Sequence, residues 1–150
     1  MNEQAFAIIK AQLGQAVPFA RHAGVEVVSV EDGAAKATIE QTDVSINHIG
    51  SQHAGALFTL GETASGAAMM GAFAEKALQI RPIAGQASIR YTKVAKGPIV
   101  ANATTSLAGS DLRETLEADG KVVFAVDVEL VDDTNEQVAT MSVDWHVRLG

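Results

Sequence analysis

Residues 53–73 read HAGALFTLGETASGAAMMGAF and form the one long apolar stretch of this 150-residue chain. Its length and its alanine content favour a helix over a strand. Nearly half of this stretch is Gly or Ala, so neighbouring elements can approach such a helix closely. A strongly curved sheet wrapped around one slim central helix is the packing that these small side chains favour.

The segments on both sides of this helix carry the period-two alternation of β-strands. Before it, residues 25–30 and 34–42 are predicted strands, joined by a hairpin turn at Glu31-Asp32-Gly33. After it the pattern predicts four more strands, at residues 84–94, 99–107, 121–131 and 137–147. In the last two of these, alternate apolar residues define one face for the core.

The remaining segments complete an α+β chain. We expect an amphipathic helix at 2–14, a connector through Pro18 and 21–24, and a polar loop at 43–52; residues 111–118 are either a helical turn or a loop. No repeat or low-complexity segment interrupts this order. We therefore expect a single domain over residues 1–150, with the N-terminal helix and connector in residues 1–20.

Composition restricts the classes of function. The chain has no cysteine, which excludes thiolate nucleophiles and disulfides. Its net charge of −7 argues against nucleic acid as the main partner. The start, MNEQAFAIIK, lacks the basic region of a secretory signal, and residues 54–74 are too poor in leucine to make a good membrane span. We expect a cytoplasmic protein without a membrane partner.

Glu62 is the most informative residue, because it is the sole ionisable side chain within residues 54–73. An unpartnered buried carboxylate is costly, so such a group usually has a partner or a function. Burial would raise its pKa and suit it to general-base catalysis near neutral pH. The alternative is a solvated helix stripe that Glu62 shares with Thr59, Thr63 and Ser65.

The start of the same helix is a candidate anion site. The residues that precede and open it, SINHIGSQHAGAL at 45–57, end in the small side chains of Ala54, Gly55 and Ala56. Unpaired N–H groups and the helix dipole could hold an oxyanion there. The alternative is an ordinary capped helix start, in which Ser51 or His53 has a structural role.

The Ala54 N–H and the Glu62 carboxylate cannot both act on one substrate carbonyl group within a single protomer. They are eight residues apart, so they lie about 12 Å apart along a helix. Two antiparallel helices in a twofold dimer could bring them together. If the chain uses these two groups together to hydrolyse a substrate, it should therefore be at least a homodimer.

The stretch from Asn47 to Glu62, NHIGSQHAGALFTLGE, resembles the hotdog thioesterases of the phenylacetate-pathway and 4-hydroxybenzoyl-CoA type. IRYTKVAKG, at 89–97, is similar to their strand that leads into a Gly- or Pro-containing turn, and the likeness covers most of residues 20–148. The resemblance implies a hotdog fold and acyl-CoA hydrolysis. It implies that Glu62 is the nucleophile or general base, that the Ala54 N–H polarises the thioester carbonyl, that Asn47 orients water or substrate, and that His53 supports the loop.

The sequence departs from the family pattern at Ala54, where Gly is usual, and at Gly66, where Ser or Thr often occurs. We take Ser65, adjacent to that position, as a substrate-binding candidate together with Gly55 and Gly66. Cationic side chains suit the phosphates of coenzyme A, and the candidates for this contact are Arg90, Lys93 and Lys96. We expect no metal and no cofactor apart from the coenzyme A of the substrate, and a homodimer or a dimer of dimers (a homotetramer).

Two other functions stay open on the sequence. The spacing between His48 and Glu62 is similar to that of the catalytic His and Glu in the hotdog dehydratases that act on 3-hydroxyacyl thioesters. The Pro-Gly that opens the dehydratase helix is missing. A non-catalytic hotdog protein that binds acyl thioesters or lipids is the second alternative.

Overall fold

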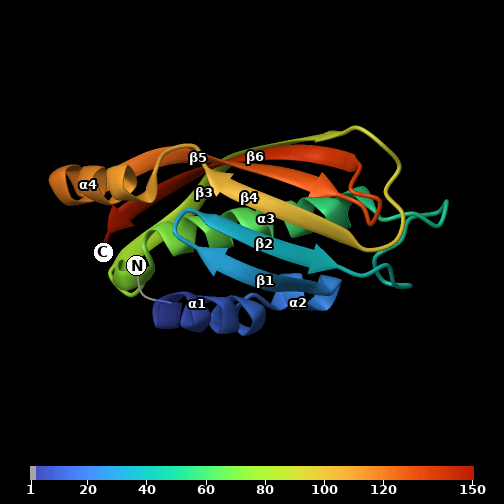
Figure 1. Ribbon diagram of the computed structural model, residues 1–150, viewed down its shortest axis with the longest axis horizontal. Coiled ribbons are helices and arrows are strands. Elements are labelled where there is room, and N and C mark those ends of the chain that lie inside the picture. Colours follow the sequence, from blue (N-terminus) through green and yellow to red (C-terminus); the bar gives the residue numbers. More distant parts are fainter. Residues whose placement is uncertain (1–2) are drawn as a thin grey trace.

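The computed structural model describes residues 3–150 (Figure 1). The helices are α1 (Glu3–Ala16), α2 (Pro18–Ala23), α3 (Ala54–Ala72) and α4 (Gly109–Asp119), with a 3-10 turn η1 (Ala74–Lys76). The strands are β1 (Val25–Glu31), β2 (Ala34–Ile39), β3 (Ile80–Tyr91), β4 (Ile99–Thr105), β5 (Lys121–Val131) and β6 (Gln137–Leu149). They form one antiparallel sheet in the order β1-β2-β4-β5-β6-β3, which curves around α3. The predicted architecture is confirmed.

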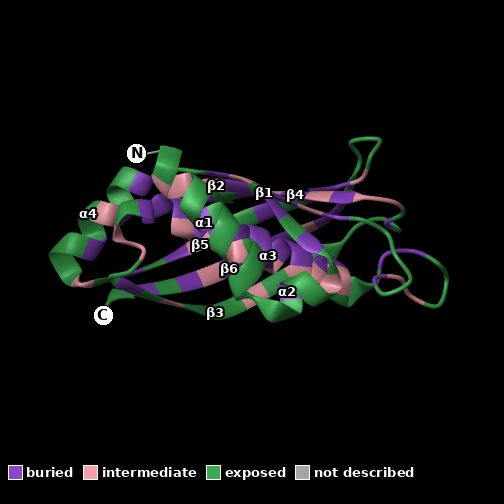
Figure 2. Cartoon of the chain, turned by 90° about the horizontal axis from the view of Figure 1, so that it is seen from below, coloured by how far each residue is buried: buried purple, intermediate pink, exposed green. Residues whose placement is uncertain are grey.

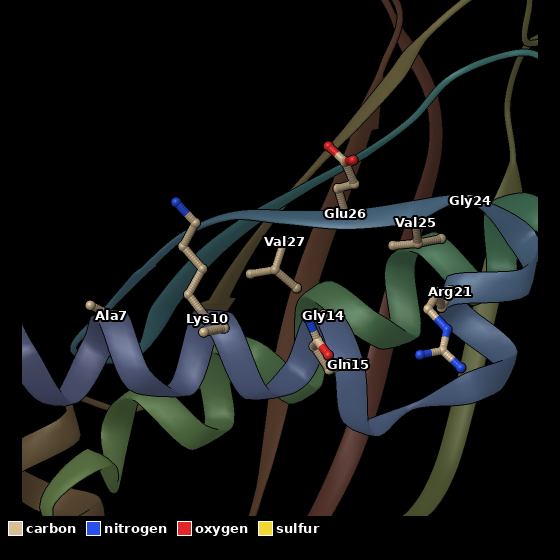
Figure 3. Close-up of a pocket in the computed structure, with 10 residues that line it drawn as sticks. Ala7, Lys10, Gly14, Gln15, Arg21, Gly24, Val25, Glu26 and Val27 are labelled. Atoms are coloured by element: carbon tan, nitrogen blue, oxygen red, sulfur yellow. The ribbon is translucent and has the colours of Figure 1, made fainter.

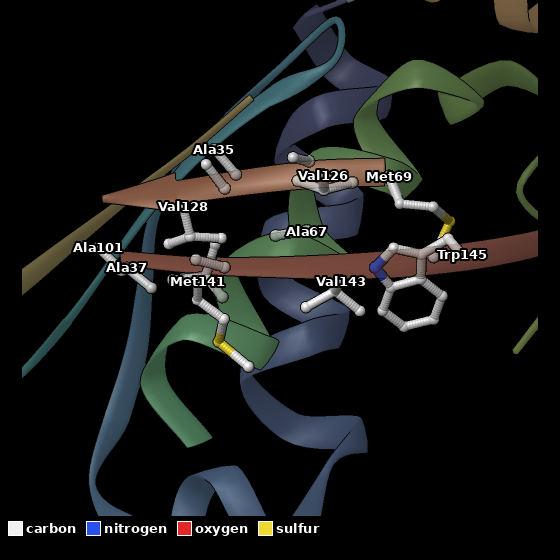
Figure 4. Close-up of a cluster of buried hydrophobic side chains, with 14 of the residues drawn as sticks. Ala35, Ala37, Ala67, Met69, Ala101, Val126, Val128, Met141, Val143 and Trp145 are labelled. Carbon is white, nitrogen blue, oxygen red and sulfur yellow. The ribbon is translucent and has the colours of Figure 1, made fainter. Parts of the chain in front are cut away.

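Small side chains on both partners bring the sheet close to α3. Ala67 of α3, Ala37 of β2 and Ala101 of β4 are all fully buried, and Figure 4 shows them within the cluster of core side chains. Larger residues fill the core under β5 and β6, among them Val126, Val143 and Trp145. The alternation predicted for these two strands is confirmed, because their expected inward residues are all buried.

Gly71 marks a close approach between α3 and the sheet. A Cβ at this position would overlap the backbone oxygen of Glu31, at the end of β1. Backbone cannot yield as a flexible side chain can, so the interface has no room for even one methyl group.

We expect Gly71→Ala to lower the free energy of unfolding by about 1–3 kcal/mol, the usual cost of overpacking a core. The matched control is Gly14→Ala in α1, where a Cβ meets no atom within 4 Å. That change should raise stability by about 0.5–1 kcal/mol through the better helix propensity of Ala. Urea denaturation of both variants checks the contrast, and equal effects would contradict the close packing.

The expected connector before β1 is helical. Pro18 opens α2 at a position where its missing N–H costs no hydrogen bond, and Gly24 ends it in the left-handed conformation with φ 92°. The segment predicted as a helical turn or loop at 111–118 is the longer helix α4. Leu112 and Leu116 bury its inner face at one end of the sheet.

The alternation of apolar residues predicts a start and an end for β3 that are both later than those in the structure. It begins at Ile80, opposite Leu149 of β6, and ends at Tyr91 rather than residue 94. A bulge between Ala84 and Gln86 interrupts the period-two pattern, which hides the first half of the strand in the sequence. β2 likewise ends at Ile39, earlier than predicted.

One edge of the sheet is uncovered. β1 forms one edge and packs against α1, whereas β3 forms the other. Most residues of β3 are exposed, as the green ribbon in Figure 2 shows. Ile83 on this strand and Leu78 just before it are 65% and 97% exposed. Among residues 3–150, no helix is both long and apolar enough to cross a membrane.

Candidate active site

The loop before α3 is held by the side chain of Asn47. Its Oδ1 accepts hydrogen bonds from the N–H of Ile49 (3.1 Å) and of Ser51 (3.0 Å). Its Nδ2 donates to Ser51 Oγ (2.8 Å) and to the Gln52 carbonyl (3.4 Å). These bonds occupy the whole capacity of the amide. In this conformation Asn47 orders the loop, and the predicted contact with water or substrate finds no spare donor or acceptor.

Gln52 fixes the same loop to the turn between β3 and β4. Its backbone N–H donates to Ala95 O (2.8 Å) and its Nε2 to Gly97 O (2.9 Å). The N–H of Gly97 in turn donates to Gln41 Oε1 (2.7 Å). Gln52 is buried, and its Oε1 has no hydrogen-bond partner within residues 3–150. Sequence reasoning gave this residue no role, because its partners are distant along the chain.

His53 caps α3 and, among residues 3–150, leaves the N–H of Ala54 free. With φ −66° and ψ 141° it is extended, and its Nδ1 accepts from the Gly55 N–H at 2.8 Å. Ala54 is exposed, and its N–H forms no hydrogen bond within the described part of the chain. An unpaired N–H at the positive end of a 19-residue helix is a suitable donor to a carbonyl oxygen.

Tyr91 ties this first turn of α3 to the end of β3. Its hydroxyl donates to the carbonyl of Ala54 at 3.0 Å. Burial raises the pKa of the Tyr91 hydroxyl, so it remains a protonated donor at neutral pH. The contact joins two positions far apart in the chain, and no local pattern reports it.

Glu62 lies two turns further along α3, on the side that the sheet leaves open. After the first helical residues, the partly exposed positions of α3 are Ala56, Phe58, Thr59, Glu62, Gly66 and Met70. Most of them follow the i, i+3, i+4 spacing of one helix face. Within residues 3–150 the Glu62 carboxylate makes no hydrogen bond or ion pair. Burial raises its pKa above the usual 4.5.

Ser65 faces the core, although it is adjacent to the open face. It is fully buried, donates to the backbone oxygen of Glu62 (2.7 Å) and accepts from Trp145 Nε1 (3.1 Å). Its predicted substrate contact does not fit this position, because its hydroxyl is engaged on the sheet side of α3. Gly66 is partly exposed instead and lies against the Trp145 ring.

The three predicted phosphate ligands are not gathered in one place. Lys93 forms ion pairs with Asp132 (3.2 Å) and with Glu136, so its charge is already compensated. Arg90 lines a hollow on the outer face of the sheet, away from α3. Lys96 is exposed in the turn beside Gly97 and forms no ion pair within residues 3–150. Of the three, Lys96 is the cation that lies near the loop.

Two hollows lie beside α2. One, of about 580 Å³, lies between α1, α2 and β1, and Figure 3 shows the charged ends of Lys10 and Arg21 pointing away from each other. The other, of about 380 Å³, lies between α2, the loop at 44–46 and the start of α3. No group of three or more His, Asp or Glu residues within residues 3–150 is arranged to hold a metal ion.

A family model described as a domain of unknown function, DUF4442, matches residues 6–147. The chain belongs to the DUF4442 family. No curated protein matches it.

Solved structures resemble this DUF4442 protein over nearly its whole length. PA5026 from Pseudomonas aeruginosa, a protein of unknown function named a probable thioesterase, is 26% identical with a TM-score of 0.83, over 96% of this chain and 95% of that one. The Escherichia coli PaaI protein of the phenylacetic acid degradation operon is 22% identical with a TM-score of 0.69, over 95% of each chain. The thioesterase SAV0944 from Staphylococcus aureus is 20% identical with a TM-score of 0.71, over 88% of this chain and 99% of that one. These likenesses confirm the predicted hotdog fold and the likeness to hotdog thioesterases.

Proposed function

We propose that this DUF4442 protein is a homodimeric thioesterase that hydrolyses an acyl-CoA or a related acyl thioester. Glu62 of one protomer would act with the Ala54 N–H of the other. The observation that carries the proposal is a partly buried carboxylate without a partner among residues 3–150, on the open face of the helix whose first N–H is also unpaired. The thioesterase names of the structural neighbours support the same reaction.

The reaction follows from these two groups. Glu62 takes a proton from a water molecule, and the oxygen of that water attacks the carbonyl carbon of the thioester. The carbonyl electron pair moves onto oxygen, where the Ala54 N–H stabilises the negative charge. When the tetrahedral intermediate collapses, the carbon–sulfur bond breaks and the thiolate takes up the proton from Glu62. In the alternative course, Glu62 attacks the carbonyl carbon directly, the carbon–sulfur bond breaks and the thiolate leaves, and water then hydrolyses the resulting anhydride to the free acid and the Glu62 carboxylate.

The exposed edge of the sheet supports the dimer. β3 is a 12-residue edge strand with exposed apolar side chains such as Ile83, and an unpaired edge strand is a template for pairing with another chain. Antiparallel pairing of β3 with β3 of a second copy would extend the sheet and cover Ile83. The twofold axis would then place the two α3 helices antiparallel, with their open faces together. Each Glu62 would approach the helix start of the other protomer, which closes the gap of about 12 Å within one chain.

The loop residues would position this site rather than react. Asn47 and Gln52 hold the loop by hydrogen bonds, and His53 caps the helix. The spacing of Asn47 and Glu62 has a counterpart in the S. aureus neighbour, which was crystallised with a Gln-to-Ala and with a Glu-to-Ala substitution. The interval between those two substituted positions equals the interval between Asn47 and Glu62. This agreement supports placing both residues at one site, where Glu62 reacts and Asn47 positions the loop.

A panel of aryl-, short- and medium-chain acyl-CoAs, assayed for release of free thiol, tests the proposal. We expect release from at least one of them. Hydration of a crotonyl thioester with the thioester bond intact would instead favour the dehydratase that uses His48 and Glu62. Binding of acyl-CoAs without any turnover would favour a non-catalytic binding protein.

The pH dependence has a definite sign. A general base must be ionised, so kcat/KM should fall as the pH falls through the pKa of Glu62, which burial places above 4.5.

The stability of the folded protein depends on pH in the opposite direction from the activity. The folded protein favours the protonated carboxyl, so stability is lost as the pH rises through this pKa. We therefore expect the Tm of Glu62→Gln to exceed that of the wild type at about pH 7 and to approach it once the pH falls below the usual pKa of 4.5. A lower Tm for the variant at neutral pH would contradict the unpaired environment.

A further inference from the structure

We propose that the hollow between α2, the loop at 44–46 and the start of α3 holds the acyl chain of the substrate, and that Phe19 sets the acyl preference. This inference rests on the proposed thioesterase function. We call this hollow the acyl groove; it is lined by Phe19, Ala23, Val44, Ile46, Ala56 and Thr59, together with His22, Ser45, His53 and Gly55.

The acyl groove adjoins the proposed site for the thioester carbonyl. His53 and Gly55, which line it, flank Ala54, whose N–H is unpaired within residues 3–150. A carbonyl oxygen that accepts from the Ala54 N–H would therefore place its alkyl or aryl substituent at the mouth of the groove. The groove and the donor share the first turn of α3, so this placement needs no movement of the backbone.

The lining suits an apolar ligand. The acyl groove contains no Asp, Glu, Lys or Arg among the described residues that line it, and its titratable groups are His22 and His53. The neighbouring hollow between α1 and β1, by contrast, is lined by Lys10, Arg21 and Glu26. Phe19 and Val44 are 69% and 66% exposed at the groove, and burying such side chains against a ligand is favourable.

The size and lining of the acyl groove suit the acyl chain of the substrate and not its coenzyme A part. Its volume of about 380 Å³ lies near the lower end of the range for small-molecule pockets. Phe19, His22 and Ala23 of α2 line one side of it, and its described lining offers no Lys or Arg for the phosphates of coenzyme A. We therefore assign the groove to the acyl chain and leave the nucleotide outside it.

The test is a chain-length profile of kcat/KM on acyl-CoAs from acetyl to dodecanoyl. Phe19→Ala opens the groove and Ala23→Leu narrows it, while Ile8→Ala in α1, at an exposed apolar position outside the groove, is the control. We expect Ala23→Leu to lower kcat/KM about 10-fold or more for the best long substrate, mainly through KM, since apolar contacts discriminate by roughly 10–200-fold. Its effect on acetyl-CoA should be small. Phe19→Ala should shift the chain length at which kcat/KM is highest. Ile8→Ala should give the same chain-length profile as the wild type.

Unchanged profiles for Phe19→Ala and Ala23→Leu, with thiol release intact, would overturn the acyl groove and leave the thioesterase proposal standing. Phe19 is exposed enough for its variant to fold even if Ala23→Leu does not. Dissociation of the dimer by Phe19→Ala, measured by light scattering, would assign the groove to the partner protomer and overturn the inference. Thiol release from no acyl-CoA would overturn both proposals.

Discussion

Glu62→Gln is expected to lower the turnover of acyl-CoA substrates by about 10²–10⁴-fold, the range that a positioned general base contributes. The amide is nearly the same size as the carboxyl but cannot accept a proton from water. Since the Glu62 carboxylate makes no hydrogen bond or ion pair within residues 3–150, the substitution breaks no side-chain contact that holds the protomer. Substrate affinity should therefore change little, and steady-state kinetics beside equilibrium binding will separate the two effects.

Glu75→Gln is the matched control, because Glu75 is exposed in η1 beyond the end of α3. Its activity should equal that of the wild type. Retention of more than a third of the wild-type turnover by Glu62→Gln would contradict a catalytic role for the carboxylate and favour the binding protein.

Ala54→Pro is expected to lower kcat by about 10²–10³-fold, because removal of one oxyanion donor has that cost in other hydrolases. The substitution deletes the N–H and little else. Proline is well tolerated at the first position of a helix, and the preceding residue, His53, already has the extended conformation that proline requires. The Tyr91 hydroxyl keeps its acceptor, since that is the carbonyl of residue 54.

The control at this position is Ala54→Gly, which keeps the N–H and restores the residue that the resembling family usually carries. It should match or exceed the wild-type kcat. Circular dichroism and thermal melting will show whether Ala54→Pro keeps the fold. A folded Ala54→Pro variant with wild-type kcat would remove the Ala54 N–H from the mechanism.

Local patterns in the sequence predicted the scaffold well. α3 could be predicted from an uninterrupted apolar stretch, and β5 and β6 from strict alternation, because both signals depend on near neighbours in the chain. β3 was located less well, since its bulge at Ala84 breaks the period and its pairing with β6 is distant. Glu62 could be found because a lone carboxylate in an apolar helix is a local anomaly.

Contacts between distant segments decided the roles that the sequence could not. The sequence predicts Lys93 as a phosphate ligand, but the β5–β6 turn places Asp132 and Glu136 beside its ammonium group. The sequence predicts Ser65 as a substrate contact because it is adjacent to the position that the family pattern marks, but Trp145 of β6 donates a hydrogen bond to its hydroxyl in the core. Gln52 shows the reverse case, since an ordinary polar loop residue anchors the loop through partners near Gly97.

The most direct test of the shared site is complementation between two inactive variants. Glu62→Gln and Ala54→Pro dimers are dissociated, mixed in equal amounts and reassociated, so that half of the dimers carry one subunit of each kind. Each mixed dimer has one site with both groups intact if the site spans two protomers, and about one quarter of the wild-type activity should return. If Glu62 and the Ala54 N–H acted within one protomer, every site in the mixture would lack one of them. Mixed dimers that form but show no recovery would therefore contradict the account.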